Sequence, residues 1–273
     1  MAKRSSNRSA PASKTSQPAD LGKGGLRPSL FLCRVFNQTD RLIPRSLALT
    51  PSPVAVVGMH RSGTSCLAGC LEDLGLNLGE VNTAAPHNLK GNRENTRLWP
   101  VHDAVLARVG AAWDNPPAEP VVWTRDEIAA LRAVLADYDG LPAPWGFKDP
   151  RATLLLDGWF EVLPDLKLVG SFRHPLAVAG SLSARNSFDL DASLGLWSAY
   201  NRAMLRWSDR LDAVIDYDAA DYEPRVRTVA ARLDLDAAAP MPFRTAELTH
   251  QRANGPVPPS CADLWGQLQE AAR

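Results

Sequence analysis

Hydrophobic residues along the chain alternate between short continuous runs and longer stretches with helical spacing. Two runs are typical of buried strands: residues 53–57, PVAVV, and residues 166–172, LKLVGSF. Each run is followed at once by a stretch whose apolar residues recur every three or four positions. Strands that alternate with helices favour an α/β fold, with a mostly parallel central sheet and helices on both faces. We therefore expect three layers.

Weaker patterns complete the expected order of elements. The segment after Thr124 is the best-marked helix, because Thr124 is a suitable N-cap and Glu127 follows three residues later. Pro175 suits the first position of another helix. Strands are also expected over 145–148 and 212–220, with a strand or loop over 120–123 and a lead-in strand or surface segment over 28–50. Helices are expected over 66–75, 124–140, 152–164, 173–185, 190–210, 223–235 and 262–272.

The charge of the chain is unevenly distributed. The 273 residues include 30 Lys and Arg and 30 Asp and Glu, so the formal net charge is zero. Residues 1–27 contain six basic residues and one acidic residue, which leaves 24 basic and 29 acidic residues for the remainder. The neutral average argues against a general nucleic-acid-binding protein.

The domain organisation follows from this uneven charge. We expect residues 1–27 to be a disordered basic tail and residues 28–273 to form one domain. The alternative for the tail is a transit peptide, which Pro11 and Pro18 make less suitable because they interrupt an amphipathic helix. No apolar run approaches the ~18 residues of a membrane span, so we expect a soluble protein, and free cysteines would suit a reducing cytoplasm. Four cysteines, none in a Cys-x-x-Cys pair, are expected to be free thiols: Cys33, Cys66, Cys70 and Cys261.

A glycine-containing loop follows the first strand. Gly58 and Gly63 have the G-x-x-x-x-G spacing of a phosphate-binding loop, but Thr64 stands where nucleotide-hydrolysing proteins have Lys. Such a loop directs backbone N–H groups and a helix N-terminus at an anion. The cation of this loop is Arg61. A structural turn without a ligand is the alternative for this motif taken alone.

The second strand ends in another candidate anion site. Arg173 follows LKLVGSF, and Ser181 lies eight residues later, two turns into the next expected helix. A guanidinium fork and a hydroxyl placed in this way are able to converge on one phosphate. An Arg at the end of a strand also often forms a surface salt bridge. The Arg173 and Ser181 element therefore indicates an anion site only in combination with the glycine loop.

Together the two motifs resemble the sulfotransferases that use 3′-phosphoadenosine 5′-phosphosulfate (PAPS), in particular the bacterial branch related to carbohydrate and tyrosyl-protein sulfotransferases. The segments GNRENTRLWPVHDAVL, WGFKDPR and LKLVGSFRHPLAVAGSLSARN carry the likeness, which runs from about residue 54 to 235. It implies a P-loop-containing α/β fold and PAPS as co-substrate. The 5′-phosphosulfate would be held by Arg61, Ser62, Gly63, Thr64, Ser65 and Cys66.

The resemblance also assigns the other end of the nucleotide. Arg173 and Ser181 would hold the 3′-phosphate. Tyr217 would lie near the adenine, although Asp218 and Ala220 depart from the family's Y-E-x-L element. Arg252 is the weak counterpart of the basic segment that closes over the 3′-phosphate.

Transfer of a sulfuryl group requires positive charge and a base for the acceptor hydroxyl. Because this group carries less charge than a γ-phosphoryl group, no metal is expected, and Arg61 would stabilise the group in transfer. The E-x-x-R spacing of Glu94 and Arg97 resembles the catalytic element of the tyrosyl branch, which implies that Glu94 is the base. Asp149, which follows a strand, is the rival candidate. Surface or structural ion pairs are the alternatives for both carboxylates.

His60 and His102 are expected to be structural or solvated, and Trp99, Trp113 and Trp145 to pack in the core or stack on an acceptor.

The expected function is therefore PAPS-dependent sulfuryl transfer to a hydroxyl of a carbohydrate or small molecule. A P-loop kinase that uses ATP and a non-catalytic nucleotide-binding protein are the alternatives. Segments 80–120 and 186–193 are expected to shape the acceptor site, because such loops vary freely on one scaffold.

Overall fold

The structure is a computed structural model that describes residues 52–86, 88, 90–245, 253 and 255–273. The expected tail over 1–27, the segment 28–50, Cys33 and Arg252 lie outside these residues. Within the described part of the chain, no helix has the length and apolar character needed to cross a membrane.

A parallel sheet of four strands forms the centre of the described part. Its strands lie in the order β2-β1-β3-β4. In β1, Val56 is paired with Lys148 of β2 on one side and with Val169 of β3 on the other. The parallel sheet confirms the predicted α/β class. The strands are β1 (Val54–Val57), β2 (Gly146–Lys148), β3 (Lys167–Phe172) and β4 (Leu211–Asp216).

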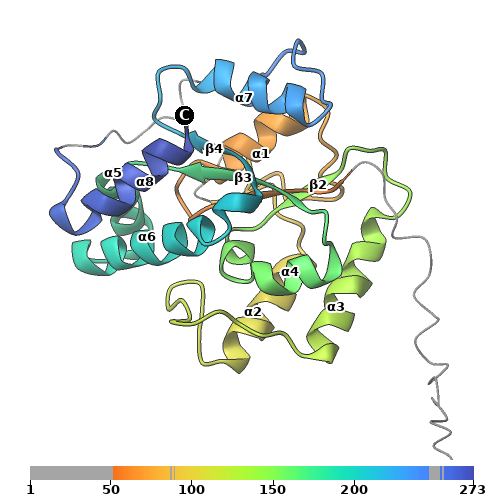
Figure 1. The fold of residues 1–273 in the computed structure, drawn as a ribbon, viewed down its shortest axis with the longest axis horizontal. Helices are drawn as coiled ribbons and strands as arrows, with labels where there is room; N and C mark the ends of the chain where they lie inside the picture. The colour runs from red at the N-terminus through yellow and green to blue at the C-terminus, as the bar shows by residue number, and fades with distance from the viewer. Residues whose placement is uncertain (1–51, 87, 89, 246–252, 254) are drawn as a thin grey trace, which may run out of the picture. The chain divides into compact units, whose positions relative to one another are not determined.

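Alternate residues of the strands contribute to two separate cores, as the period of two in a strand requires. Val54 and Val56 pack with α1 (Thr64–Asp73) and α7 (Tyr222–Arg232) on one face. Ala55 and Val57 pack into the larger core on the other face. Figure 1 shows α1 and α7 above the sheet and α2, α3 and α4 below it.

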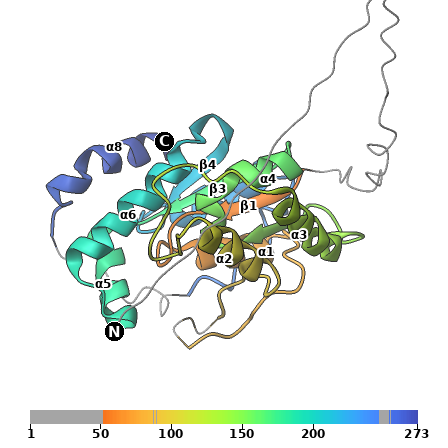
Figure 2. The ribbon, with the colours of Figure 1, turned by 90° about the horizontal axis from the view of Figure 1, so that it is seen from below.

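The larger core is covered by six helices. Helices α5, α6 and α8 lie beside one another at the same side of the sheet in both views (Figures 1 and 2). The helices on both faces confirm the predicted three layers. The six are α2 (Leu98–Arg108), α3 (Arg125–Leu135), α4 (Leu156–Val162), α5 (Pro175–Asn186), α6 (Leu190–Leu205) and α8 (Ala262–Ala271). Short 3₁₀ turns complete the order: η3 (Ala136–Tyr138), η4 (Pro150–Leu154), η5 (Ser208–Arg210) and η7 (Pro259–Cys261).

Local sequence signals identified several helix ends correctly. Thr124 and Glu127 form the predicted capping box at the start of α3, and Pro175 is the first residue of α5. Helix α1 is followed by Gly75, which has a φ of 107°. These ends depend on hydrogen bonds and backbone angles that nearby residues set by themselves, which is why the sequence reveals them.

Other predicted elements differ from the structure. The helix expected over 152–164 is divided into η4 and α4, and the long helix expected over 190–210 stops at Leu205. The division has a tertiary cause: Thr153 Oγ1 accepts a hydrogen bond from Gly58 N at 2.8 Å, which ties η4 to the first loop. Residues 120–123 form a loop, which is one of the two alternatives that the sequence left open. Helix α2 was not predicted, since Pro100 interrupts its pattern, although Pro is tolerated in a first turn.

Candidate functional site

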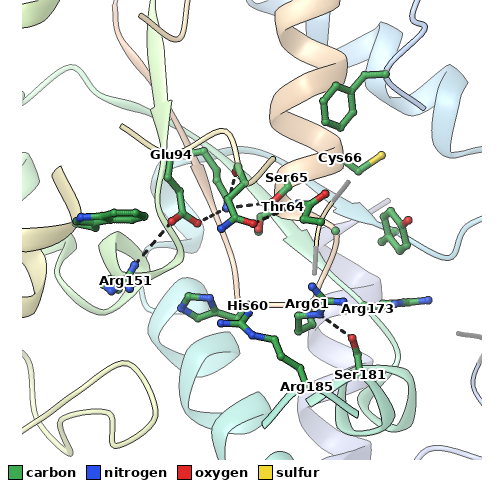
Figure 3. A pocket seen from close by; sticks show the side chains of 17 residues that line it. His60, Arg61, Thr64, Ser65, Cys66, Glu94, Arg151, Arg173, Ser181 and Arg185 are labelled. Atoms are coloured by element: carbon green, nitrogen blue, oxygen red, sulfur yellow. Dashed lines mark hydrogen bonds and ion pairs between the residues drawn. The ribbon is translucent and has the colours of Figure 1, made fainter. Parts of the chain in front are cut away.

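A polar cavity lies where the four parallel strands end. Residues that follow β1, β2, β3 and β4 all contribute to its wall, as is usual for ligand sites of open α/β sheets. The cavity has a volume of about 300 Å³. Its lining consists of His60, Arg61, Gly63, Thr64, Ser65, Cys66, Asn88, Asn92, Glu94, Trp99, Lys148, Arg151, Arg173, Ser181, Arg185, Tyr217 and Phe243. In Figure 3, Glu94 and Arg151 lie on one side, Arg61, Arg173 and Ser181 lie on the other, and His60 lies between them.

The glycine loop connects β1 to α1 and forms one wall. Gly63 has a φ of 84°, and a Cβ added to it would lie 2.2 Å from Cδ2 of Tyr217, so Gly63 must be glycine. Gly63 is also the N-cap of α1 and provides no side-chain cap. Thr64, Ser65 and Cys66 of the first turn line the cavity, and the N–H groups of a first turn have no partner within their helix.

The predicted loop residues occupy different positions in this wall. Gly63, Thr64, Ser65 and Cys66 line the cavity, whereas Ser62 is fully buried and its backbone oxygen accepts a hydrogen bond of 2.7 Å from Ser171 Oγ. Ser62 thus fixes the loop to β3. Cys66 Sγ lies 4.0 Å from Cys70 Sγ on the same helix face. Both cysteines are buried free thiols, as is Cys261, which confirms that prediction for the described cysteines.

The two sequence motifs meet at one end of the cavity. Arg61 Nε donates a hydrogen bond of 2.7 Å to Ser181 Oγ, although the residues are 120 positions apart. Arg173 Nε donates to Asp218 Oδ1 at 3.0 Å, and the guanidinium carbon lies 4.9 Å from the centre of the Tyr217 ring. Arg61, Arg173, Ser181 and Tyr217 are therefore brought together. We call these four residues the arginine end.

Positive charges lie close together around Arg61. Burial lowers the pKa of Arg61, and the nearby guanidinium groups of Arg185 and Arg173 lower it further. The side chain remains cationic because its ordinary pKa is so high. The lowered pKa thus reflects both the burial of Arg61 and the positive charge around it.

A second cluster, formed by Glu94, Lys148 and Arg151, occupies the opposite end of the cavity. Lys148 Nζ lies 2.6 Å from Glu94 Oε1 and 3.2 Å from Ser65 Oγ, so it links the carboxylate to the glycine loop. Arg151 Nη1 lies 4.0 Å from Glu94 Oε2. We call these three residues the glutamate end. Lys148 was not among the predicted site residues, and its position at the end of the strand in FKDP was the available signal.

Tertiary contacts hold Glu94 in place. The Glu94 amide donates to Asn82 Oδ1, and the Asn82 amide donates to the backbone oxygen of Glu94, each at 3.0 Å. Arg93, with a φ of 57°, precedes it and forms an ion pair of 2.9 Å with Glu72 of α1. The strained backbone at Arg93 is thus anchored to the helix that carries the loop.

Asp149, the rival candidate base, is 1% exposed and is not among the described lining residues. Its carboxylate contacts His102 Nδ1 at 2.9 Å and Arg151 Nη1 at 3.1 Å. Burial raises the pKa of Asp149, but the interactions with His102 and Arg151 outweigh burial and bring it below its ordinary value. Asp149 is thus ionised and separated from the cavity. Its neighbour Arg151 lines the cavity.

The other aromatic and histidine candidates divide between core and cavity. Trp145 is fully buried and its ring centre lies 4.6 Å from that of Tyr138, so it belongs to the core. Trp99 lines the cavity, and half-buried Trp113 packs against His60. His60 also lines the cavity, and its Nε2 has no hydrogen-bond partner among the described residues. Burial, aided by the charge of Arg151, lowers the pKa of His60, so its imidazole is neutral at neutral pH.

The charge of the cavity differs from that of the chain. Its described lining includes five cationic side chains and a single carboxylate, Glu94, in a protein with zero net charge. The donor set suits a compact polyanion. The cations are Arg61, Lys148, Arg151, Arg173 and Arg185. Within the described residues, no group of three or more His, Cys, Asp or Glu side chains is arranged to hold a metal ion.

Comparisons with known proteins give a limited result. No protein-family model matches the sequence, and no curated protein matches it. Among solved structures, the sulfotransferase domain of the Synechococcus PCC 7002 olefin synthase is similar over 79% of this chain and 88% of its own, with 18% identity and a TM-score of 0.42. Sulfotransferase STF1 from Mycobacterium tuberculosis H37Rv is similar over 81% and 76%, with 14% identity and a TM-score of 0.39. Both TM-scores are below 0.5 and both identities are below 25%.

Proposed function

We propose that this protein is a sulfotransferase that moves the sulfuryl group of PAPS to a hydroxyl of a carbohydrate or small molecule. The observation that carries the proposal is the hydrogen bond of 2.7 Å between Arg61 and Ser181. It joins the phosphate loop after β1 to the R-x-P-x₅-S element after β3. A phosphate loop alone is common, whereas its union with a second anion site suits a nucleotide phosphorylated at two places.

The arginine end would bind the nucleotide. Arg173 and Ser181 provide a guanidinium fork and a hydroxyl for the 3′-phosphate, and the Tyr217 ring provides a surface for the base. The amides of Thr64, Ser65 and Cys66 would hold the 5′-phosphosulfate at the start of α1. Such a ligand is negatively charged, so it fits the cationic lining of the cavity. Gly63 has no side chain that would fill the space beside the loop.

The glutamate end would carry out the transfer. Glu94 would accept the proton of the acceptor hydroxyl, and Lys148, between Glu94 and Ser65, would stabilise negative charge on the group in transfer. Arg61 would share that role from the other side. Glu94 is preferred to Asp149 because Glu94 lines the cavity.

The same site argues against a kinase that uses ATP. Thr64 occupies the position where the phosphate loop of such enzymes has the Lys for the β- and γ-phosphates. Lys148 reaches the loop from β2 instead, where it is paired with Glu94 rather than placed among the loop amides.

Calorimetric titration with 3′-phosphoadenosine 5′-phosphate (PAP) and with ATP, each with and without Mg²⁺, tests this proposal. We expect PAP to bind without Mg²⁺ and more tightly than ATP, because ATP lacks the 3′-phosphate. Transfer of ³⁵S from labelled PAPS to a panel of hydroxylated sugars and small molecules then tests catalysis. Binding of ATP that depends on Mg²⁺, without binding of PAP, would contradict the proposal. Binding of PAP without transfer to any acceptor would favour a non-catalytic nucleotide-binding protein.

A further inference from the structure

A continuous series of hydrogen bonds runs behind the glutamate end. Trp159 Nε1 contacts His102 Nε2 at 3.0 Å, His102 Nδ1 contacts Asp149 Oδ2 at 2.9 Å, and Asp149 Oδ1 contacts Arg151 Nη1 at 3.1 Å. Trp159, His102 and Asp149 are at most 1% exposed. The series begins in the core and ends at a cation of the cavity wall.

The chemistry of each group fixes where the protons lie. An indole N–H only donates, so His102 Nε2 must be the unprotonated nitrogen that accepts from Trp159. The proton of the neutral imidazole is then on Nδ1, which donates to the Asp149 carboxylate. The direction of the whole series is thus set by one indole group.

Asp149 also holds Arg151 through hydrogen bonds. One carboxylate oxygen, Oδ1, accepts from both the Arg151 backbone amide at 3.0 Å and Nη1 at 3.1 Å. Arg151 Nε donates to Asp103 at 2.7 Å, so the guanidinium is held by two carboxylates. The same Nη1 lies 4.0 Å from Glu94 Oε2, which lines the cavity.

We infer that Asp149, oriented by His102 and Trp159, is a positioning residue that holds Arg151 against Glu94. Fixed there, Arg151 orients the Glu94 carboxylate toward the acceptor. Asp149 acts through Arg151 and does not touch the reacting atoms. The effect on catalysis rests on the proposed function, whereas the proton positions do not.

Asp149→Asn is the variant that breaks the series. Both oxygens of the Asp149 carboxylate accept hydrogen bonds, one from His102 and one from Arg151. The NH₂ group of Asn cannot accept, so in the variant it would point at the donor of one of these two residues. We expect kcat to fall about 10²-fold, as for small misplacements of catalytic groups, with PAP affinity unchanged. Asp157→Asn is the matched control, because Asp157 forms an exposed ion pair with Arg206.

A double-variant cycle separates positioning from a general structural role. If Asp149 acts through Arg151, Asp149→Asn will lower kcat in the wild-type background but not in an Arg151→Ala background. Equal losses of kcat in both backgrounds would overturn the inference. Arg151→Lys should restore part of the activity lost in Arg151→Ala, because it keeps the charge without the fork.

A measurement on the whole protein covers the case in which the Asp149 variant does not fold. In ¹⁵N NMR spectra of wild-type protein labelled at histidine, we expect one imidazole with protonated Nδ1 and bare Nε2. Its signals should change in Trp159→Phe, which keeps the ring size but removes the donor. A His102 protonated at Nε2 would overturn the inference even if transfer from PAPS is found. Absence of PAP binding beside the expected tautomer would instead count against the proposed function.

Discussion

The two ends of the cavity hold their charges in different ways. At the arginine end, Arg61 donates to a neutral hydroxyl and Arg173 to a carboxylate whose side chain is 28% exposed. At the glutamate end, Lys148 and Glu94 form an ion pair with side chains 2% and 5% exposed. Buried ion pairs lose much of their Coulomb energy to desolvation and are costly to disrupt one partner at a time. The glutamate end is therefore held by a buried ion pair, whereas the arginine end combines a neutral hydroxyl with a partly exposed carboxylate.

The largest effect is expected when the glutamate end loses its proposed base. Glu94→Gln keeps the shape and one acceptor oxygen for Lys148 but removes the group proposed to take the proton. We expect kcat to fall by about 10²- to 10⁴-fold, the range for general bases, with PAP affinity within twofold of wild type. The measurements are steady-state transfer and calorimetry. Glu80→Gln, at an exposed position, is the control, and full activity in Glu94→Gln would assign the base elsewhere.

Arg61→Ala tests whether the arginine end also serves catalysis. Removal of one donor that stabilises developing charge is expected to lower kcat by about 10²- to 10³-fold. PAP binding should weaken as well, because Ser181 loses its partner. The exposed Arg202→Ala on α6 controls for loss of charge alone. A change in PAP affinity with unaltered kcat would restrict Arg61 to binding.

Arg173→Ala should separate binding from chemistry. A charged hydrogen bond contributes about 1.5–3 kcal/mol, so PAP affinity is expected to fall roughly 10- to 100-fold while kcat at saturation is retained. Asp218, partly exposed, remains solvated in this variant. The control is Arg132→Ala at an exposed position of α3. A loss in kcat as large as that expected for Arg61→Ala would contradict the assignment of the two arginines to different phosphates.

The arginine end could be predicted from the sequence because local features define it. Gly58 and Gly63 mark the loop, and the strand before Arg173 and Pro175 after it place Arg173 and Ser181. In a parallel sheet, the loops after neighbouring strands lie at one edge, which explains why the two local motifs meet.

The glutamate end could be predicted only in part, because long-range contacts build it. Nothing near Glu94 in the sequence indicates that Asn82 holds its backbone or that Lys148, 54 residues later, pairs with it. Asp149 was a reasonable candidate at the end of a strand. Its separation from the cavity depends on His102 and Trp159, which α2 and α4 bring into the core.

The smallest effect is expected at Ser181, the neutral residue that accepts a hydrogen bond from Arg61 at the arginine end. Ser181→Ala removes one hydroxyl that accepts from Arg61 Nε, and a neutral group of this kind contributes about 0.5–1.5 kcal/mol, or roughly 2- to 10-fold in PAP affinity. Ser183→Ala, exposed and two residues along the same helix, should leave PAP affinity unchanged. In an Arg173→Ala background the serine effect should shrink, because both side chains are assigned to one phosphate. Calorimetry on the four proteins of this cycle measures that coupling, and strict additivity would show that Ser181 and Arg173 bind different groups.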